Sequence, residues 1–162
     1  MQNIERTLII AKPDAMERNL AGEIISRFQK AGLRVAGLKM MQINRELAEQ
    51  HYSSDDSQVV GMGNKTLQAT GEEKVLQIFG TIEPKEVGMK LREWLLSFII
   101  SKPVIVFVLE GENAIAEARK ITGSTDPSKS EKGTVRGDLG DDSIAKANEE
   151  GRPVVNLVHA SD

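Results

Sequence analysis

The run "NLVHASD" brings four chemically capable side chains close together: Asn156, His159, Ser161 and Asp162. His159 is one of only two histidines in 162 residues, and it lies in an apolar run that predicts a strand. Alternate residues of a strand share a face, so His159 and Ser161 should lie together. A histidine in an apolar strand is more often a buried structural side chain, but a neutral imidazole is also a nucleophile toward phosphorus. With these neighbours, His159 suggests phosphoryl transfer.

Three cations and a hydroxyl could complete such a site. Lys12 ends the apolar run "TLIIAK", and Arg119 lies near the end of a predicted helix. Arg136 and Thr125 lie in the polar loop 124–140. Phosphoryl transfer depends mainly on positioning and on neutralising the charge of the phosphate oxygens, which lysine and arginine provide. Any one of these cations alone would be read as a solvated surface charge, so the interpretation depends on their joint pattern.

Three longer segments carry a resemblance to a known family. They are "ERTLIIAKPDAMERNLAGEIISRF", "GSTDPSKSEKGTVRGD" and "NLVHASD", and in order and spacing they resemble the hallmark segments of nucleoside diphosphate kinases. The resemblance covers roughly Glu5 to Tyr52 and Trp94 to Asp162. It implies a ferredoxin-like fold and a ping-pong reaction. In that reaction a nucleoside triphosphate gives its γ-phosphoryl group to the histidine, which passes it to a nucleoside diphosphate.

The resemblance also implies roles for individual residues. It makes His159 the phosphorylated nucleophile, with Ser161 and Asp162 supporting its ring and the water shell of a metal ion. The phosphate and ribose contacts that it implies are Lys12, Tyr52, Arg119, Thr125, Arg136 and Asn156. We expect Mg²⁺ to arrive with the nucleotide and to be held by phosphate oxygens, because the sequence offers no dedicated carboxylate cage.

The sequence departs from the family pattern in three places. The aromatic residue that usually stacks on the base is absent, and Leu91 and Leu95, with Pro153 as a weaker assignment, stand near the positions of the base clamp. The chain is also longer than usual between Arg136 and Asn156. The family normally supplies a glutamate after the histidine. We expect this sequence to be a piece of a longer protein that carries it, the alternative being a substitute such as Asp141, Asp142 or another carboxylate.

The elements that must position these residues follow from hydrophobic periodicity and from cap signals. Asn19, Asn44 and Asn113 are expected to cap helices, and Gly32 and Gly123 to end them. The expected strands are 7–12, 33–43, 104–111 and 153–160, and the expected helices are 20–32, 45–52, 86–99 and 113–123.

This order predicts an α+β class fold for a single domain spanning 1–162. We expect a ferredoxin-like βαββαβ sandwich, a four-stranded antiparallel sheet with helices on one face. A lid-like excursion with one helical piece is expected at about 53–85. The run "VGMGNKT" inside it lacks the spacing of a phosphate-binding loop, and no strong strand precedes it.

Composition and charge narrow the functional classes and partners that remain. The net charge of −3 and sequence pI near 5.5 give no basic face for nucleic acid, and the absence of cysteine excludes disulfides and thiolate chemistry. The start of the chain lacks the pattern of a secretory signal, and the apolar runs are too short to cross a membrane. We therefore expect a cytoplasmic protein with no nucleic acid or membrane partner, assembled as a homo-oligomer such as a tetramer or hexamer built from dimers.

Two other functional classes stay open from the sequence. One is a catalytically impaired nucleotide-binding regulatory or scaffold protein with the same fold. It would bind nucleotide without transferring phosphate to a second nucleotide. The other is a ferredoxin-like ligand- or RNA-binding module. It is less favoured because the chain has few aromatic side chains on which bases could stack.

Overall fold

The computed structural model describes residues 3–162, which fall into two units, each described here by itself. The first unit contains the sheet and comprises the residues up to Gln42, Lys102–Asp141 and Asn156–Asp162. The second unit is helical and comprises Ile43–Ser101 and Asp142–Val155. Within residues 3–162, none of the helices has the length and apolar character needed to cross a membrane.

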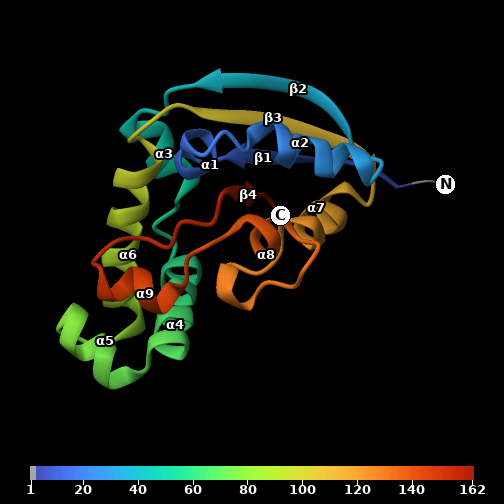
Figure 1. Cartoon of the computed structure of the whole chain (residues 1–162). Helices are drawn as coiled ribbons and strands as arrows, with labels where there is room; N and C mark the ends of the chain where they lie inside the picture. The colour runs from blue at the N-terminus through green and yellow to red at the C-terminus, as the bar shows by residue number, and fades with distance from the viewer. Residues whose placement is uncertain (1–2) are drawn as a thin grey trace. The chain divides into compact units, whose positions relative to one another are not determined.

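The first unit contains the strands of the sheet and the helices that connect them (Figure 1). In chain order they are β1 (Ile4–Ala11), α1 (Pro13–Glu17), α2 (Ala21–Lys30), β2 (Arg34–Met41), β3 (Val104–Glu112), α7 (Ala114–Thr122), a 3-10 helix (Pro127–Lys129), α8 (Val135–Leu139) and β4 (Val158–Ala160).

The four strands form one antiparallel sheet with the order β2-β3-β1-β4. The register places Ile9 of β1 opposite Phe107 of β3, and Ile10 opposite His159 of β4. The strand order and the intervening helices are those of a ferredoxin-like α+β fold, so the predicted fold class is confirmed.

One face of the sheet is covered by helices. Ile9 and Phe107 share that face, and they pack in one buried cluster with Phe28 of α2 and Ala118 of α7. The rings of Phe28 and Phe107 meet edge to face at 6.0 Å between centroids. Burial of such apolar side chains drives the packing of the helices on the sheet, as predicted from the periodicity of the segment that forms α2.

Helix caps follow the sequence in part. Asn44 caps α3 (Arg45–His51) as predicted, since its side chain accepts a hydrogen bond from Leu47 N at 2.9 Å. Asn113 occupies the N-cap position of α7 as predicted, but it has a left-handed φ of 51° and its side chain makes no capping hydrogen bond. Asn19 was expected to cap α2, but it lies outside the N-cap position and takes a left-handed φ of 56°. The N-cap of α2 is Leu20. Asparagine tolerates the left-handed region as well as it caps, so its type alone does not decide between the two roles.

The last predicted strand, 153–160, was too long. The observed β4 has only three residues, Val158–Ala160. Leu157 precedes it with φ of 69°, an angle that interrupts an extended strand. The strand therefore begins only one residue before His159.

The second unit consists of five helices (Figure 1). They are α3 (Arg45–His51), α4 (Asp56–Thr70), α5 (Glu72–Phe79), α6 (Pro84–Ile99) and α9 (Ile144–Glu149). The prediction of a single helical piece in 53–85 was wrong, because this stretch forms α4, α5 and the start of α6. Helix α9 was also not predicted.

Close packing explains why α4 escaped prediction. A Cβ atom at Gly63 of α4 would overlap the carbonyl of Pro84, and one at Gly88 of α6 would overlap the carbonyl of Val59. These glycines weaken the helical pattern of the sequence, yet they let the backbones of α4 and α6 approach each other closely. The contact between the two helices compensates for the weak intrinsic helical preference.

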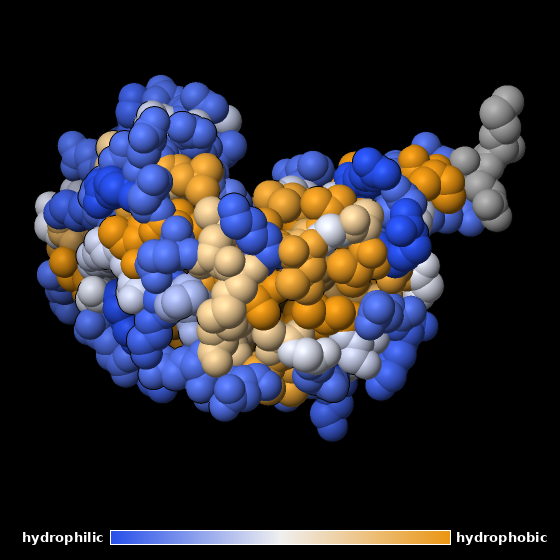
Figure 2. All heavy atoms as spheres, turned by 90° about the horizontal axis from the view of Figure 1, so that it is seen from above, coloured by the Kyte–Doolittle hydropathy of each residue, from blue (hydrophilic) through white to orange (hydrophobic). Residues whose placement is uncertain are grey.

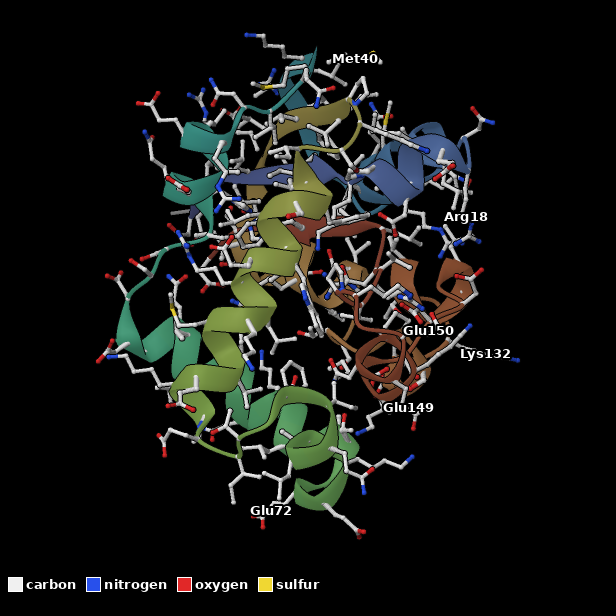
Figure 3. The ribbon with its side chains drawn as sticks, turned by 90° about the vertical axis from the view of Figure 1, so that its left-hand side faces the viewer. Arg18, Met40, Glu72, Lys132, Glu149 and Glu150 are labelled. Atoms are coloured by element: carbon white, nitrogen blue, oxygen red, sulfur yellow. The ribbon has the colours of Figure 1, made fainter. Side chains whose placement is uncertain are left out.

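The outer strand β2 presents apolar side chains to solvent. Leu38 and Met40 stand at alternate positions and are 53% and 60% exposed. Figure 2 shows an apolar area over the strands of the sheet, and Figure 3 shows Met40 at the margin of the molecule, pointing outward. As the first strand in the order β2-β3-β1-β4, β2 also has one edge without a strand neighbour among the described residues.

Candidate active site

A chain of hydrogen bonds joins three of the predicted site residues in the first unit. Lys12 follows β1, is only 5% exposed, and donates from Nζ to Asn156 Oδ1 at 2.8 Å. Asn156 is 3% exposed and donates from Nδ2 to the carbonyl oxygen of Thr125 at 2.9 Å. Residues that are far apart in the sequence, 12, 125 and 156, are therefore brought together as predicted.

Arg136 of α8 lies in the same cluster, but its observed bonds are to the backbone. Its guanidinium donates to the carbonyl oxygens of Gly123, Asn156 and Val158, at 3.1, 3.1 and 2.6 Å. The side chain is 8% exposed. Arg136 thus fixes the backbone on both sides of Leu157, a structural role in addition to the phosphate contact predicted for it.

The backbone just before β4 makes a tight left-handed turn. Leu157 has φ of 69°, and Val158 N donates to Asn156 O at 2.8 Å, which closes a three-residue turn. Asp14 of α1 accepts the Leu157 N–H on Oδ2 at 2.8 Å. Asp14 is not among the site residues predicted from the sequence. Its position could have pointed to it, because Asp14 is a carboxylate that stands two residues after Lys12, the last residue of the predicted strand.

His159 lies in the middle of β4, with its Cα paired to that of Ile10. Its Nε2 is 3.0 Å from Ser161 Oγ, so the predicted support of the ring by Ser161 is present. The hydroxyl and the ring nitrogen can each donate or accept, depending on the tautomer. Ser161 is itself held, because its N–H donates to Leu8 O and its carbonyl oxygen accepts from Thr7 Oγ1, both at 3.0 Å. The sheet therefore fixes the ring through its neighbour.

Two further predicted residues lie at the surface of this unit. Arg119 near the end of α7 forms an ion pair with Asp162, and both side chains are more than half exposed. The side chain of Thr125 is also exposed, and its backbone carbonyl is the atom that joins the cluster. An exposed ion pair exchanges readily with solvent and ligands. Arg119 is therefore a cation that an incoming phosphate can recruit.

The electrostatics of the cluster centre on Lys12. The pKa of its ammonium is lowered from 10.5 to about 8, first by burial and then by the neighbouring charge of Arg136, while the charge of Asp14 opposes both. A buried cation next to a second cation favours an anionic ligand, because a phosphate compensates both charges. The cluster has the character of an oxyanion site.

The two carboxylates proposed as substitutes for the family glutamate are already paired. Asp141 Oδ1 lies 3.5 Å from Arg18 in the first unit. Asp142 of the second unit is 6% exposed and makes a bidentate pair with Arg152, at 2.6 and 2.9 Å. Its Oδ2 also accepts from Val155 N at 2.9 Å. These contacts give both carboxylates a structural role in their own loops.

The remaining predicted contacts, Tyr52, Leu91, Leu95 and Pro153, belong to the second unit. Tyr52 ends α3, and its carbonyl oxygen accepts from Arg92 Nε at 2.7 Å. Leu91 is 9% exposed within the apolar core of this unit, whereas Leu95 and Pro153 are partly exposed. Packing accounts for Leu91, which leaves Leu95 and Pro153 as the more accessible of the base-clamp residues.

Metal-binding side chains do not gather in either unit. Within residues 3–162 there is no group of three or more histidine, aspartate or glutamate side chains arranged to hold a metal ion. Lys12 and Arg136, which are joined through Asn156, are donors suited to phosphate oxygens.

Comparison with known proteins gives a consistent result. The family described as "Nucleoside diphosphate kinase" matches residues 5–60 and 84–162. A nucleoside diphosphate kinase of Pyrobaculum aerophilum is 45% identical over 98% of this chain and 88% of its own length. One of Pyrococcus furiosus is 40% identical over 100% of this chain and 77% of its own length.

Two solved structures extend the comparison to the fold. The crystal structure of the Pyrobaculum aerophilum NDP kinase has a TM-score of 0.93 at 44% identity, and covers 98% of this chain and 88% of that one. A transition state mimic of the Borrelia burgdorferi nucleoside-diphosphate kinase, with bound vanadate and ADP, has a TM-score of 0.74 at 32% identity. The match covers 98% of this chain and 79% of the Borrelia chain.

Proposed function

The chain belongs to the nucleoside diphosphate kinase family and has its activity, and from this premise we propose that His159 is the residue that carries the phosphoryl group. The observation that supports this most strongly is the position of His159 in β4. Its Cα is paired with that of Ile10, two residues before Lys12, and its ring is held by Ser161. A nucleophile needs such an oriented ring next to groups that neutralise phosphate charge.

The proposed reaction has two half-steps. In the first, a ring nitrogen of His159 attacks the γ-phosphorus of a nucleoside triphosphate, the bond to the β–γ bridging oxygen breaks, and a nucleoside diphosphate leaves. In the second, a terminal β-phosphate oxygen of an acceptor diphosphate attacks the same phosphorus, and the P–N bond breaks to return the imidazole. The histidine ends each cycle unchanged, so the two substrates use one site in turn.

The neighbouring residues supply charge and positioning. We assign Lys12 to the transferred phosphate because its ammonium is buried, held by Asn156, and flanked by Arg136. Arg119 joins as a surface cation that can leave its pair with Asp162. Thr125 and Asn156 provide hydrogen-bonding groups for the phosphates and the ribose. Tyr52, Leu95 and Pro153 remain the candidates for contacts to the nucleoside.

We further propose that Mg²⁺ accompanies the nucleotide. The residues around His159 fit this mode of binding, since they are donors for phosphate oxygens and not a carboxylate cage. When bound, the ion would neutralise phosphate charge and help to orient the phosphate chain. Asp162 is the carboxylate assigned to its water shell.

A labelling experiment tests the assignment of His159. Incubation with γ-labelled ATP and Mg²⁺ should give an acid-labile, alkali-stable label on the peptide that contains His159. His159→Gln should abolish both the label and the transfer to a second nucleoside diphosphate. The chain offers a matched control, because His51 is its only other histidine, and His51→Gln should keep the label. A His159→Gln protein that labels like the wild type would refute the assignment. Nucleotide binding without transfer by the wild type would favour the scaffold alternative.

We also propose a cytoplasmic homo-oligomer. The exposed Leu38 and Met40 on the unpaired edge strand β2 support an assembly that covers them, because edge strands with apolar faces tend to pair. The mass of the protein in solution distinguishes a tetramer from a hexamer.

A further inference from the structure

We propose that Asp14 is a positioning residue for the reaction, whose carboxylate holds the left-handed turn at Leu157 from which the strand of His159 begins. The inference deepens the proposed function and rests on the assignment of His159 as the nucleophile. Asp14 belongs to neither the predicted phosphate contacts nor the ring support, and its contacts are all within the first unit.

The turn at Leu157 is a strained conformation. The residue is not a glycine, and φ of 69° brings its Cβ close to the backbone carbonyl, at a cost of about 1–2 kcal/mol. The bond from Val158 N to Asn156 O closes a three-residue turn of the rarer, strained kind. Such a conformation persists only where the surroundings over-determine it.

The contacts that hold this turn come from three directions. Lys12 N donates to Leu157 O at 2.8 Å, and Arg136 donates to the carbonyl oxygens of Asn156 and Val158. All of these partners are donors, and they satisfy only carbonyl groups. Asp14 Oδ2 is the acceptor for the N–H of Leu157, at 2.8 Å. Without it, a buried N–H would lose its partner, which typically costs about 1–3 kcal/mol.

Satisfying one N–H does not explain the choice of a carboxylate. Asp14 is 9% exposed, and its Oδ1 is buried without a hydrogen-bond partner among the described residues. A buried unsatisfied oxygen is unfavourable for stability, so the presence of a carboxylate at this position needs a further explanation. The negative charge of Asp14 provides it. Lys12 is faced by two ionised groups, Arg136 from α8, which lowers its pKa, and Asp14 from α1, which raises it.

The position of Leu157 along the chain connects its hydrogen bond to Asp14 with the reaction. Leu157 stands two residues before His159, and β4 is only three residues long. Ser161 ties the far end of this short strand to β1, whereas at its near end the direction of the strand depends on the turn at Leu157. A relaxed turn would displace the imidazole from its place opposite Ile10. Small displacements of a nucleophile reduce the rate of the chemical step more than they reduce substrate binding.

Two substitutions separate the hydrogen bond that Asp14 accepts from Leu157 from the negative charge of Asp14. Asp14→Ala removes both, whereas Asp14→Asn keeps an oxygen that can accept the Leu157 N–H but removes the charge. Glu5→Ala is the matched control. Glu5 is another carboxylate of the first unit that accepts a backbone N–H, from Ile115 at 3.2 Å, but it lies near the opposite end of β1 from Lys12.

The measurements are single-turnover phosphorylation of His159, the pH profile of kcat/KM, and hydrogen exchange at the Leu157 amide. Asp14→Ala should lower kcat about 10- to 100-fold with a much smaller change in KM, and should speed exchange at Leu157. Asp14→Asn should keep more of kcat and speed the exchange less. It should also move the alkaline limb of kcat/KM to lower pH, because Lys12 loses its compensating charge. Glu5→Ala should leave all three readouts unchanged.

The outcomes distinguish the two levels of the argument. If wild-type protein shows no label on His159, the assignment of the nucleophile fails. Hydrogen exchange at the Leu157 amide still shows whether Asp14 holds the turn. If the wild type labels and Asp14→Ala labels at the same rate, the positioning role is overturned. If Asp14→Ala does not fold, Asp14→Asn decides, since unchanged exchange at Leu157 together with an unchanged alkaline limb would also overturn it.

Discussion

Replacing Lys12 with methionine should have opposite effects on two properties. It should remove the free-energy cost of burying a charge, and it should lower the activity. Methionine has a similar length and no charge, so it keeps much of the packing of the buried side chain. The folded protein holds the Lys12 pKa at about 8, mainly through burial, against the ordinary lysine value of 10.5. At about 1.4 kcal/mol per pH unit, that gap corresponds to about 3 kcal/mol of unfavourable free energy when the ammonium is charged. We therefore expect Lys12→Met to change how stability depends on pH.

The sign follows from which state binds the proton. Below pH 8 Lys12 is charged in both the folded and the unfolded chain, and the cost of burying the charge is fully present. Between pH 8 and 10.5 the folded state releases the proton while the unfolded state keeps it, so the free energy of unfolding rises with pH. The wild type should gain about 3 kcal/mol across this window relative to Lys12→Met, and nothing further above it.

Urea unfolding between pH 7 and 11 measures the difference between the two proteins, which cancels the titration of the other lysines. The methionine variant loses the bond from Lys12 Nζ to Asn156, so its stability at a single pH is less informative than the slope. The same variant should lose about 10²- to 10³-fold in kcat, as expected when a donor to a developing oxyanion is removed. Parallel stability curves for the two proteins would refute the view of Lys12 as a desolvated cation.

Two predictions concern the second unit, and urea unfolding checks both. Asp142→Ala should destabilise the protein by about 2–3 kcal/mol, because it breaks the bidentate pair with Arg152 and removes the acceptor of the Val155 N–H. Arg152 keeps its bond to Glu150, and a loss below about 0.5 kcal/mol, typical of a surface pair, would contradict the prediction. Gly88→Ala should destabilise by about 1–3 kcal/mol, because the new Cβ meets the Val59 carbonyl. Gly61→Ala, on the same α4 helix as Val59 but in open space, should be neutral or stabilising by about 0.5–1 kcal/mol; equal effects of the two changes would refute the close packing of α4 and α6.

Local sequence patterns predicted most of the first unit. The alternation in the segment that forms β4 placed His159 with Ser161, and the glycines at 32 and 123 ended helices with positive φ as expected. These features depend on neighbours within a few residues, where backbone and side-chain preferences act directly. The convergence of Lys12 and Asn156, which are 144 residues apart, was implied by the family resemblance and not by a local pattern.

The features that escaped prediction depend on distant contacts. Leu157 is left-handed because Asp14, 143 residues earlier, accepts its N–H, and no pattern around Leu157 indicates this. Helix α4 contains Gly63, which weakens a local helical pattern, and only packing against α6 explains its place. Tertiary contacts override local preference at exactly such positions, and a single sequence does not contain their geometry.

Departures from local rules concentrate around the histidine strand. Within the first unit, Lys12 is a buried cation, Leu157 is a left-handed residue that is not glycine, and Asp14 keeps a buried oxygen without a partner. Each of these lowers stability, and each would be removed by a simple substitution if stability were the only requirement. Hydrogen bonds join Lys12 and Asp14 to Leu157, which lies two residues before His159. A fold that satisfies ordinary rules in its core and breaks three of them together beside one strand supports the proposal that this strand is shaped by the reaction.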